Sequence, residues 1–132
     1  MSTSRISFIN KMLISLCSHH RIQVVRATNP EQHATVFDLK SKSITLGFQA
    51  DPQVGILRFA YMVGLFVFEE DHSTRIEQEC YAWEWAIDFI RTCDPKLKFS
   101  RLSIAWAVRH LKQSAGEQVP QEYIDYFDLL RE

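Results

Sequence analysis

RFAYMVGLFVF, at residues 58–68, is the stretch that decides the fold of this 132-residue chain. Its residues are apolar on nearly every side of a helix, and Arg58 is its only charged residue. A helix with this pattern is buried in the centre of a domain. The uncharged part, residues 59–68, is much shorter than the roughly 20 residues that a membrane-spanning helix needs. The stretch therefore predicts a central buried helix in a globular domain, with no membrane segment.

Local signals mark the start of this helix and of the helix that follows it. Asp51 can cap the free N–H groups of a helix N-terminus, and Pro52 fits the first turn. Thr74 and Glu77 have the spacing of a capping box, which starts a second helix over residues 74–92. We expect these two helices to be the central, buried helices of the fold.

The rest of the chain predicts strands before these helices and two more helices after them. Apolar residues at helical spacing indicate a first helix over residues 6–17. Three runs of β-branched or alternating apolar residues follow, at residues 22–26, 34–39 and 43–48. Ser100 and Pro120 can start the last two helices. The expectation is one α+β domain over residues 1–132: an N-terminal helix, a small three-stranded antiparallel sheet and a helical bundle.

Composition and charge exclude several classes of protein. A hydrophobic content of 46% and an aromatic content of 12% fit a folded core rather than a disordered chain. The net charge of −1 gives no general attraction to nucleic acid or to acidic membranes. A helix-turn-helix over the basic residues 96–112 is also disfavoured, because the next helix is acidic and phosphates would repel it. We expect a cytoplasmic protein that binds neither nucleic acid nor membrane.

Two segments carry small and acidic residues in the pattern of a zinc-peptidase core. Such a core needs two histidines four residues apart, a glutamate beside the first, and a third ligand from a later helix. AYMVGL at residues 60–65 and ECYAWEWA at residues 79–86 resemble the A-H-E-L-G-H and E-x-x-A-x-x-F-A helices of the ImmA/IrrE metallopeptidases. The resemblance covers roughly residues 20–90 and implies a zincin-like fold. The shared residues are Ala60, Gly64, Glu79, Ala82 and Ala86.

The departures from that family are at the metal-binding positions. Tyr61 and Leu65 stand in place of both histidine ligands, and Met62 stands in place of the catalytic glutamate. Only Glu79 remains of the ligand set, and a single carboxylate does not hold zinc. The resemblance therefore implies a pseudo-enzyme with no metal and no cofactor. We expect the Tyr61 hydroxyl to hydrogen-bond to Glu79 where the metal would have been.

A family member without its metal could still bind the kind of protein that active members cleave. The resemblance implies a partner among transcriptional regulators, in stress response or on a mobile genetic element. The expected function is a non-catalytic protein-interaction or regulatory module. The candidate partner-binding surface is aromatic and acidic, as interface hot spots often are aromatic, although a helix packed on two sides would show the same pattern. Its residues are Trp83, Glu84, Trp85 and Asp88.

Other interpretations remain open, and so does the oligomeric state. A buried helix of any ancestry also explains residues 58–68, with Gly64 required by a closely packed neighbour. An enzyme could use Tyr61, Glu79 and a nearby histidine as acid–base groups in the former metal cleft. A structural, oligomer-forming protein of a phage or genomic island could use the tryptophan face or a terminal helix that carries Tyr123, Tyr126 and Phe127.

Two further clusters of reactive side chains are weaker candidates. Residues 69–72, EEDH, concentrate metal-ligating groups, but neighbours at a helix end point apart, which favours a solvated loop. Cys17 with His19 and His20 could be a nucleophile and base, but side chains two or three residues apart do not converge well. The three cysteines match no metal or redox spacing, and Cys17 is most simply a small core residue.

Overall fold

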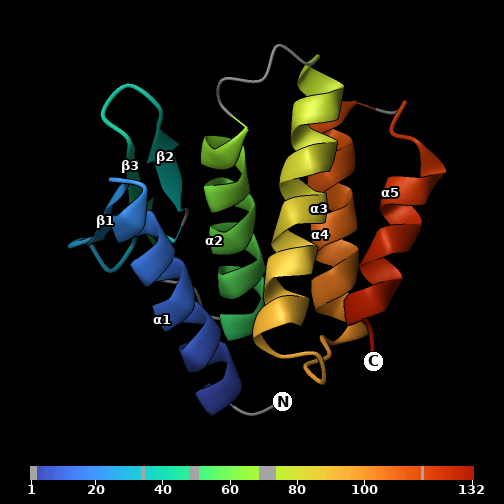
Figure 1. The fold of residues 1–132 in the computed structure, drawn as a ribbon, viewed down its shortest axis with the longest axis horizontal. Helices are drawn as coiled ribbons and strands as arrows, with labels where there is room; N and C mark the ends of the chain where they lie inside the picture. Colours follow the sequence, from blue (N-terminus) through green and yellow to red (C-terminus); the bar gives the residue numbers. More distant parts are fainter. Residues whose placement is uncertain (1–2, 34, 48–50, 69–73, 117) are drawn as a thin grey trace.

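The computed structural model describes residues 3–33, 35–47, 51–68, 74–116 and 118–132. Its elements follow the expected order of one helix, three strands and four helices, which confirms the α+β class (Figure 1). A short 3₁₀-helix, η1, ends the chain. The elements are α1 (Thr3–His19), β1 (Gln23–Arg26), β2 (Val36–Asp38), β3 (Ser43–Leu46), α2 (Pro52–Val67), α3 (Arg75–Cys93), α4 (Arg101–Ala115), α5 (Gln121–Tyr126) and η1 (Phe127–Leu130).

The sheet is mixed, so the expectation of a fully antiparallel sheet is wrong. β3 lies in the centre, parallel to β1 and antiparallel to β2. Residues 39–42 join β2 to β3, and Lys42 in this turn adopts the left-handed region at φ 51°. β1 and β2 are the two edge strands although they are consecutive in the sequence, and β3 lies between them. Alternation of apolar residues defines the two faces of a strand but not its neighbours, so the sequence pattern could not reveal this order.

α2 occupies the middle of the molecule, as its apolar sequence predicts. α1 and the sheet lie on one side of it, and α3, α4 and α5 follow on the other side (Figure 1). α2 packs most extensively on α3, and it also contacts α1 and α4. Among the described residues, no helix combines the length and apolar character that crossing a membrane requires. The buried residues of α2 are Ile56, Leu57, Phe59, Ala60, Tyr61, Met62, Val63, Gly64 and Phe66.

α2 and α3 come into backbone contact at Gly64. A Cβ atom at this position would lie 2.6 Å from the carbonyl oxygen of Ala82 and 3.0 Å from its Cα. Because these are backbone atoms, they cannot rotate aside to accept a side chain. The expectation that a close neighbour requires Gly64 is therefore confirmed.

The expected helix starts are also present. The side chains of Asp51, Thr74 and Ser100 each accept a hydrogen bond from an N–H group in the first turn of α2, α3 and α4. The side chain of Gln53 links two of these starts, because its Oε1 accepts a hydrogen bond of 2.9 Å from the Ser100 N–H. The caps thus fix the beginnings of the three helices that surround the candidate site.

Candidate functional site

Tyr61 on α2 and Glu79 on α3 form a hydrogen-bonded pair inside the protein. The Tyr61 hydroxyl donates to Oε2 of Glu79, so the predicted contact between these two side chains is confirmed. Tyr61 is 4% exposed and Glu79 is 8% exposed. Polar groups buried to this degree need a partner, because an unpaired one loses its bonds to water without compensation. Tyr61 supplies the hydrogen-bond donor, and Glu79 supplies the acceptor.

Aromatic rings from α3 and α4 surround the pair. The Tyr61 ring stacks on Trp83, with 4.8 Å between ring centroids and an interplanar angle of 18°. The ring of His110 meets Tyr61 edge-on, with 4.9 Å between centroids. The ring centroids of Trp106 and His110 lie 5.3 Å apart, so Trp106 extends the aromatic cluster along α4. The region between α2, α3 and α4 is therefore occupied by rings around one hydrogen bond.

Burial determines which groups of the pair are charged. It raises the pKa of the Tyr61 phenol above its ordinary value, and the hydrogen bond and charge of Glu79 raise it further, while Ser114 and Arg75 lower it. Burial also raises the pKa of the Glu79 carboxyl, while the hydrogen bond from Tyr61 and the charge of Arg75 lower it. The phenol is consequently a neutral donor around neutral pH and cannot act as a base.

His110 is the histidine that lies against the pair. Its Nδ1 and the Trp83 Nε1 are buried and form no hydrogen bond with any described residue. Burial lowers the pKa of His110, and the charge of Arg58 lowers it further. The Arg58 guanidinium itself lies 4.8 Å from the ring centroid of Trp106. The alternative of an acid–base enzyme assumed a histidine near Tyr61, but the sequence gave no means of choosing His110, which lies on a separate helix.

The other two positions at which the resemblance would place metal-site residues are apolar and lie against the core. Met62 is buried, and Leu65 is half-buried and packs against the core cluster. Over residues 3–33, 35–47, 51–68, 74–116 and 118–132, no three His, Cys, Asp or Glu side chains are grouped as a metal site. The EEDH cluster at residues 69–72 lies outside the described residues.

The candidate partner-binding residues divide between the core and the surface. Trp83 is 1% exposed, so the prediction that it belongs to a surface patch is wrong. It lies on the side of α3 that faces Tyr61 and α4, because helical periodicity separates it from its neighbours in sequence. The other three residues do reach the surface. There they line a shallow hollow of about 300 Å³ whose residues are Phe68, Tyr81, Glu84, Trp85 and Asp88.

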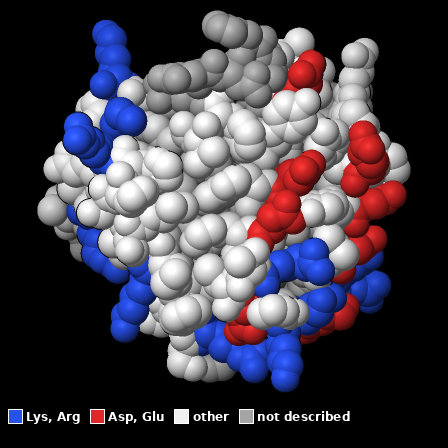
Figure 2. Space-filling model, in the orientation of Figure 1, with Lys and Arg blue, Asp and Glu red and all other residues white. Residues whose placement is uncertain are grey.

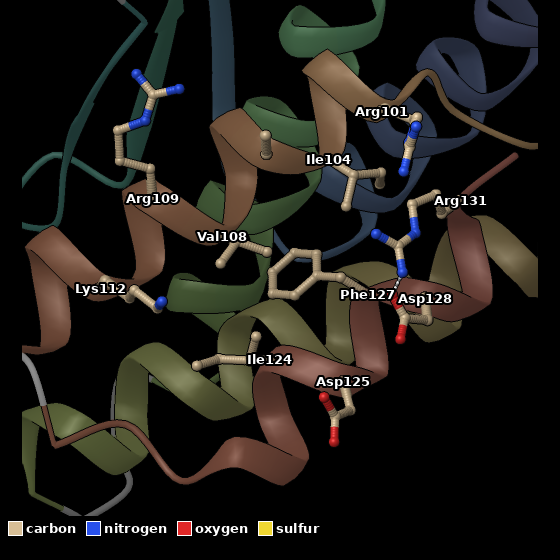
Figure 3. Close-up of a pocket in the computed structure, with 11 residues that line it drawn as sticks. Arg101, Ile104, Val108, Arg109, Lys112, Ile124, Asp125, Phe127, Asp128 and Arg131 are labelled. Atoms are coloured by element: carbon tan, nitrogen blue, oxygen red, sulfur yellow. Dashed lines mark hydrogen bonds and ion pairs between the residues drawn. The ribbon is translucent and has the colours of Figure 1, made fainter.

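A second surface feature, a groove between α4 and the end of the chain, was not predicted from the sequence. Its volume is about 510 Å³. Figure 3 shows apolar side chains, including Phe127, between the two helices, with charged side chains along the rim. Arg101, Arg109 and Lys112 come from α4, and the opposite side carries Asp125 and Asp128, the second of which is ion-paired with Arg131. The sequence signal for this groove is that a basic helix is followed by an acidic helix. That change of charge was interpreted only as evidence against DNA binding.

Two other candidates from the sequence are largely internal. Cys17 is fully buried, and burial raises the pKa of its thiol to about 11, so it is unsuited to nucleophilic chemistry. On the terminal helix, Phe127 is fully buried and Tyr123 is half-buried. The Tyr126 hydroxyl donates to Oδ1 of Asp88, which fastens α5 to α3.

The Tyr61–Glu79 pair can hold a proton and join two helices, but solvent hardly reaches it. A neutral phenol, a carboxyl of raised pKa and a neutral imidazole are the groups present. Comparison of the chain with protein-family models, with curated proteins and with solved structures finds no significant match.

Proposed function

We propose that this chain is a non-catalytic protein-interaction or regulatory module built on a degenerate metallopeptidase scaffold of the ImmA/IrrE kind. The observation that carries the proposal is the hydrogen bond from Tyr61 to Glu79. In the family that the sequence resembles, the residue at the position of Glu79 is the third metal ligand. In this protein the same carboxylate accepts a hydrogen bond from the side chain that replaces the first histidine.

The burial of the pair argues against chemistry at this place. A catalytic zinc site keeps one coordination position open for water or substrate. Tyr61 and Glu79 are 4% and 8% exposed, and the rings of Trp83 and His110 lie against the phenol. A general acid or base must also come within hydrogen-bond distance of its substrate. The same burial therefore disfavours the alternative of an acid–base enzyme that uses Tyr61 and Glu79.

The surface then carries the function. Asp and Glu side chains gather over α3 and α5 in the view of Figure 2, whereas Lys and Arg side chains lie mainly at the opposite edge and along the lower part. Separated charge of this kind steers and orients a protein partner. We propose a protein partner, such as a transcriptional regulator encoded on the same mobile genetic element, and a cytoplasmic setting.

Restoring the missing ligands tests the scaffold directly. The variant Tyr61→His, Met62→Glu, Leu65→His would place two imidazoles four residues apart on α2, with Glu79 as the third ligand. We expect this variant to bind one zinc ion per chain in isothermal titration calorimetry, with the wild-type chain as the control. A variant that keeps its far-UV circular dichroism but binds no zinc would contradict the proposed ancestry.

The inactive character of the wild-type protein needs a separate measurement. We expect purified protein to contain no stoichiometric zinc by elemental analysis and to cleave no co-expressed regulator. Zinc at one equivalent, together with proteolysis that a chelator abolishes, would contradict the proposal. Recovery of a specific protein from the native host by wild-type protein, but not by a variant with Glu84→Gln and Trp85→Ala, would identify the partner and the surface that binds it.

A further inference from the structure

The hollow on the outer side of α3 combines aromatic walls with carboxylates. Tyr81, Glu84, Trp85 and Asp88 recur at helical spacing and form one stripe along the helix, and Phe68 at the end of α2 closes one side. The Phe68 and Tyr81 ring centroids are 5.8 Å apart. Behind the hollow, the Trp85 ring stacks on Phe89 with 5.1 Å between centroids. Ring contacts with Phe68 and Phe89 therefore hold in place Tyr81 and Trp85, two of the residues that line the hollow.

Glu84 places its carboxylate in this hollow. It is half-buried, and it forms no ion pair or hydrogen bond with any described residue. Burial raises the pKa of its carboxyl, and the negative charges of Asp88 and Glu122 raise it further. Asp88, one turn along α3, accepts a hydrogen bond from the Tyr126 hydroxyl on one of its oxygens. The hollow thus places two carboxylates beside partly exposed aromatic side chains, and among the described residues no Lys or Arg side chain forms an ion pair with either carboxylate.

We propose that this hollow binds the side chain of an arginine carried by the partner protein. The proposal rests on the proposed function, because it names the chemistry by which the interaction module recognises its partner. A guanidinium stacks on aromatic faces and at the same time donates hydrogen bonds to carboxylates in a planar fork. The Trp85 and Tyr81 rings offer such faces, and Glu84 and Asp88 offer the acceptors one helical turn apart.

Arginine fits this combination better than other cations. A quaternary ammonium group would use the rings but would leave the Glu84 carboxylate without a hydrogen bond. A lysine ammonium is strongly hydrated and stacks less well on a ring than a planar guanidinium. A neutral side chain would not offset the desolvation of the carboxylate. The pairing of flat aromatic walls with carboxylates therefore selects a planar, charged donor.

The test uses the whole chain and three blocked tripeptides, Gly-Arg-Gly, Gly-Lys-Gly and Gly-citrulline-Gly, followed by two-dimensional NMR. We expect Gly-Arg-Gly to shift the Trp85 indole N–H and the Glu84 amide in a saturable way within about 50 mM, because one cation–π contact and two charge-assisted hydrogen bonds give affinity in the millimolar range. Citrulline has nearly the shape of arginine without its charge, and we expect at least about tenfold weaker binding of its peptide. Equal binding of citrulline or lysine, or no shift with arginine, would overturn the proposal.

Matched variants locate the site. Glu84→Gln and Asp88→Asn keep the size of each side chain, and Asp88→Asn keeps an acceptor for Tyr126. We expect each to weaken Gly-Arg-Gly binding at least about fivefold, since each removes one charge-assisted hydrogen bond. Asp125→Asn removes an exposed acid outside the hollow and should leave binding unchanged. Full binding by the folded double variant of Glu84 and Asp88 would overturn the proposal.

The outcome separates this inference from the function on which it rests. A partner protein that binds wild-type and Glu84→Gln chains equally would overturn the arginine site and leave the interaction module standing. Analytical ultracentrifugation covers the case of a second copy of this chain, which carries exposed Arg101 and Arg109 on its own surface. Self-association that Glu84→Gln abolishes would overturn the assignment to a different protein, whereas a monomer that binds Gly-Arg-Gly supports it.

Discussion

Removal of the Tyr61 hydroxyl is the sharpest test of the buried pair. Tyr61→Phe keeps the ring that stacks on Trp83 and deletes only the donor to Glu79. The carboxyl is 8% exposed, so water does not fully replace the lost hydrogen bond. Leaving a buried acceptor without its partner costs about 1–3 kcal/mol, towards the upper end for a charged one. In a chain of 132 residues, that loss lowers the Tm by roughly 4–12 °C.

The contribution of Glu79 to the free energy of unfolding should depend on pH, and the direction follows from its pKa. The pKa of Glu79 is raised in the folded protein, so the folded state binds the proton more tightly than the unfolded state does. The contribution of the carboxyl to stability is complete below its unfolded pKa of about 4.3 and is lost as the pH rises through the folded pKa. Glu79→Gln removes this titration and keeps an acceptor for the Tyr61 hydroxyl. Its free energy of unfolding should therefore rise relative to that of the wild type as the pH rises above about 4.3.

The measurement is urea unfolding followed by circular dichroism for wild type, both single variants and the double variant Tyr61→Phe, Glu79→Gln. The cycle should give a coupling free energy of about 0.5–3 kcal/mol between the two positions. Tyr126→Phe is the matched control, because Tyr126 also donates to a carboxylate, but at an exposed site where the loss should stay below about 1 kcal/mol. A Tyr61→Phe loss no larger than this control at pH 7 would refute the reasoning, as would parallel pH curves for wild type and Glu79→Gln.

Three further substitutions or modifications test the packing and caps around the site. Gly64→Ala should destabilise the protein by about 1–3 kcal/mol in urea unfolding, although alanine favours helix, because its Cβ would meet the Ala82 backbone at 2.6 Å. The Cys17 thiol, buried and with a pKa of about 11, should resist iodoacetamide at pH 8 by mass spectrometry until denaturant is added; rapid native labelling would contradict its burial. Thr74→Ala should lower the free energy of unfolding by about 1 kcal/mol, because Oγ1 loses the 3.3 Å hydrogen bond from the Glu77 N–H, whereas Thr74→Ser should retain most of it.

Local physics made the helices predictable. Asp51 and Thr74 cap their helices by accepting hydrogen bonds from backbone N–H groups only two or three residues ahead. Such local contacts can be predicted from the sequence. The burial of α2 was equally accessible, because apolar residues on all sides leave a helix no stable place except a core. The Tyr61–Glu79 contact could be predicted because the two helices are consecutive, although that prediction also used a family pattern.

Contacts between distant segments were not accessible in this way. The place of β3 between β1 and β2 depends on the pairing of β1 with β3, which lies about 20 residues further along the chain, and no periodicity encodes that pairing. His110 reaches Tyr61 only because α4 packs against both α2 and α3. Trp83 and Trp85 look alike in the sequence, yet the rotation of α3 sends one into the core and leaves the other beside the surface hollow. The sequence does carry a signal for that rotation, because apolar residues recur at helical spacing around Trp83, at Cys80, Ala86, Ile87 and Ile90, and this stripe was not used.

The buried pair is not the most stable way to fill this part of the core. Replacing both members of such a pair by apolar groups of similar shape is often neutral or stabilising, so stability alone does not explain Tyr61 and Glu79. The rest of α2 offers an almost wholly apolar surface, and apolar contacts have no preferred direction of their own. The Tyr61–Glu79 hydrogen bond adds to the close Gly64–Ala82 contact in fixing the register, because a shift of α3 would leave both a hydroxyl and a carboxyl buried without partners. Under the proposed ancestry, a metal once held these two helices in register, and the Tyr61–Glu79 hydrogen bond now does so without an open position for chemistry.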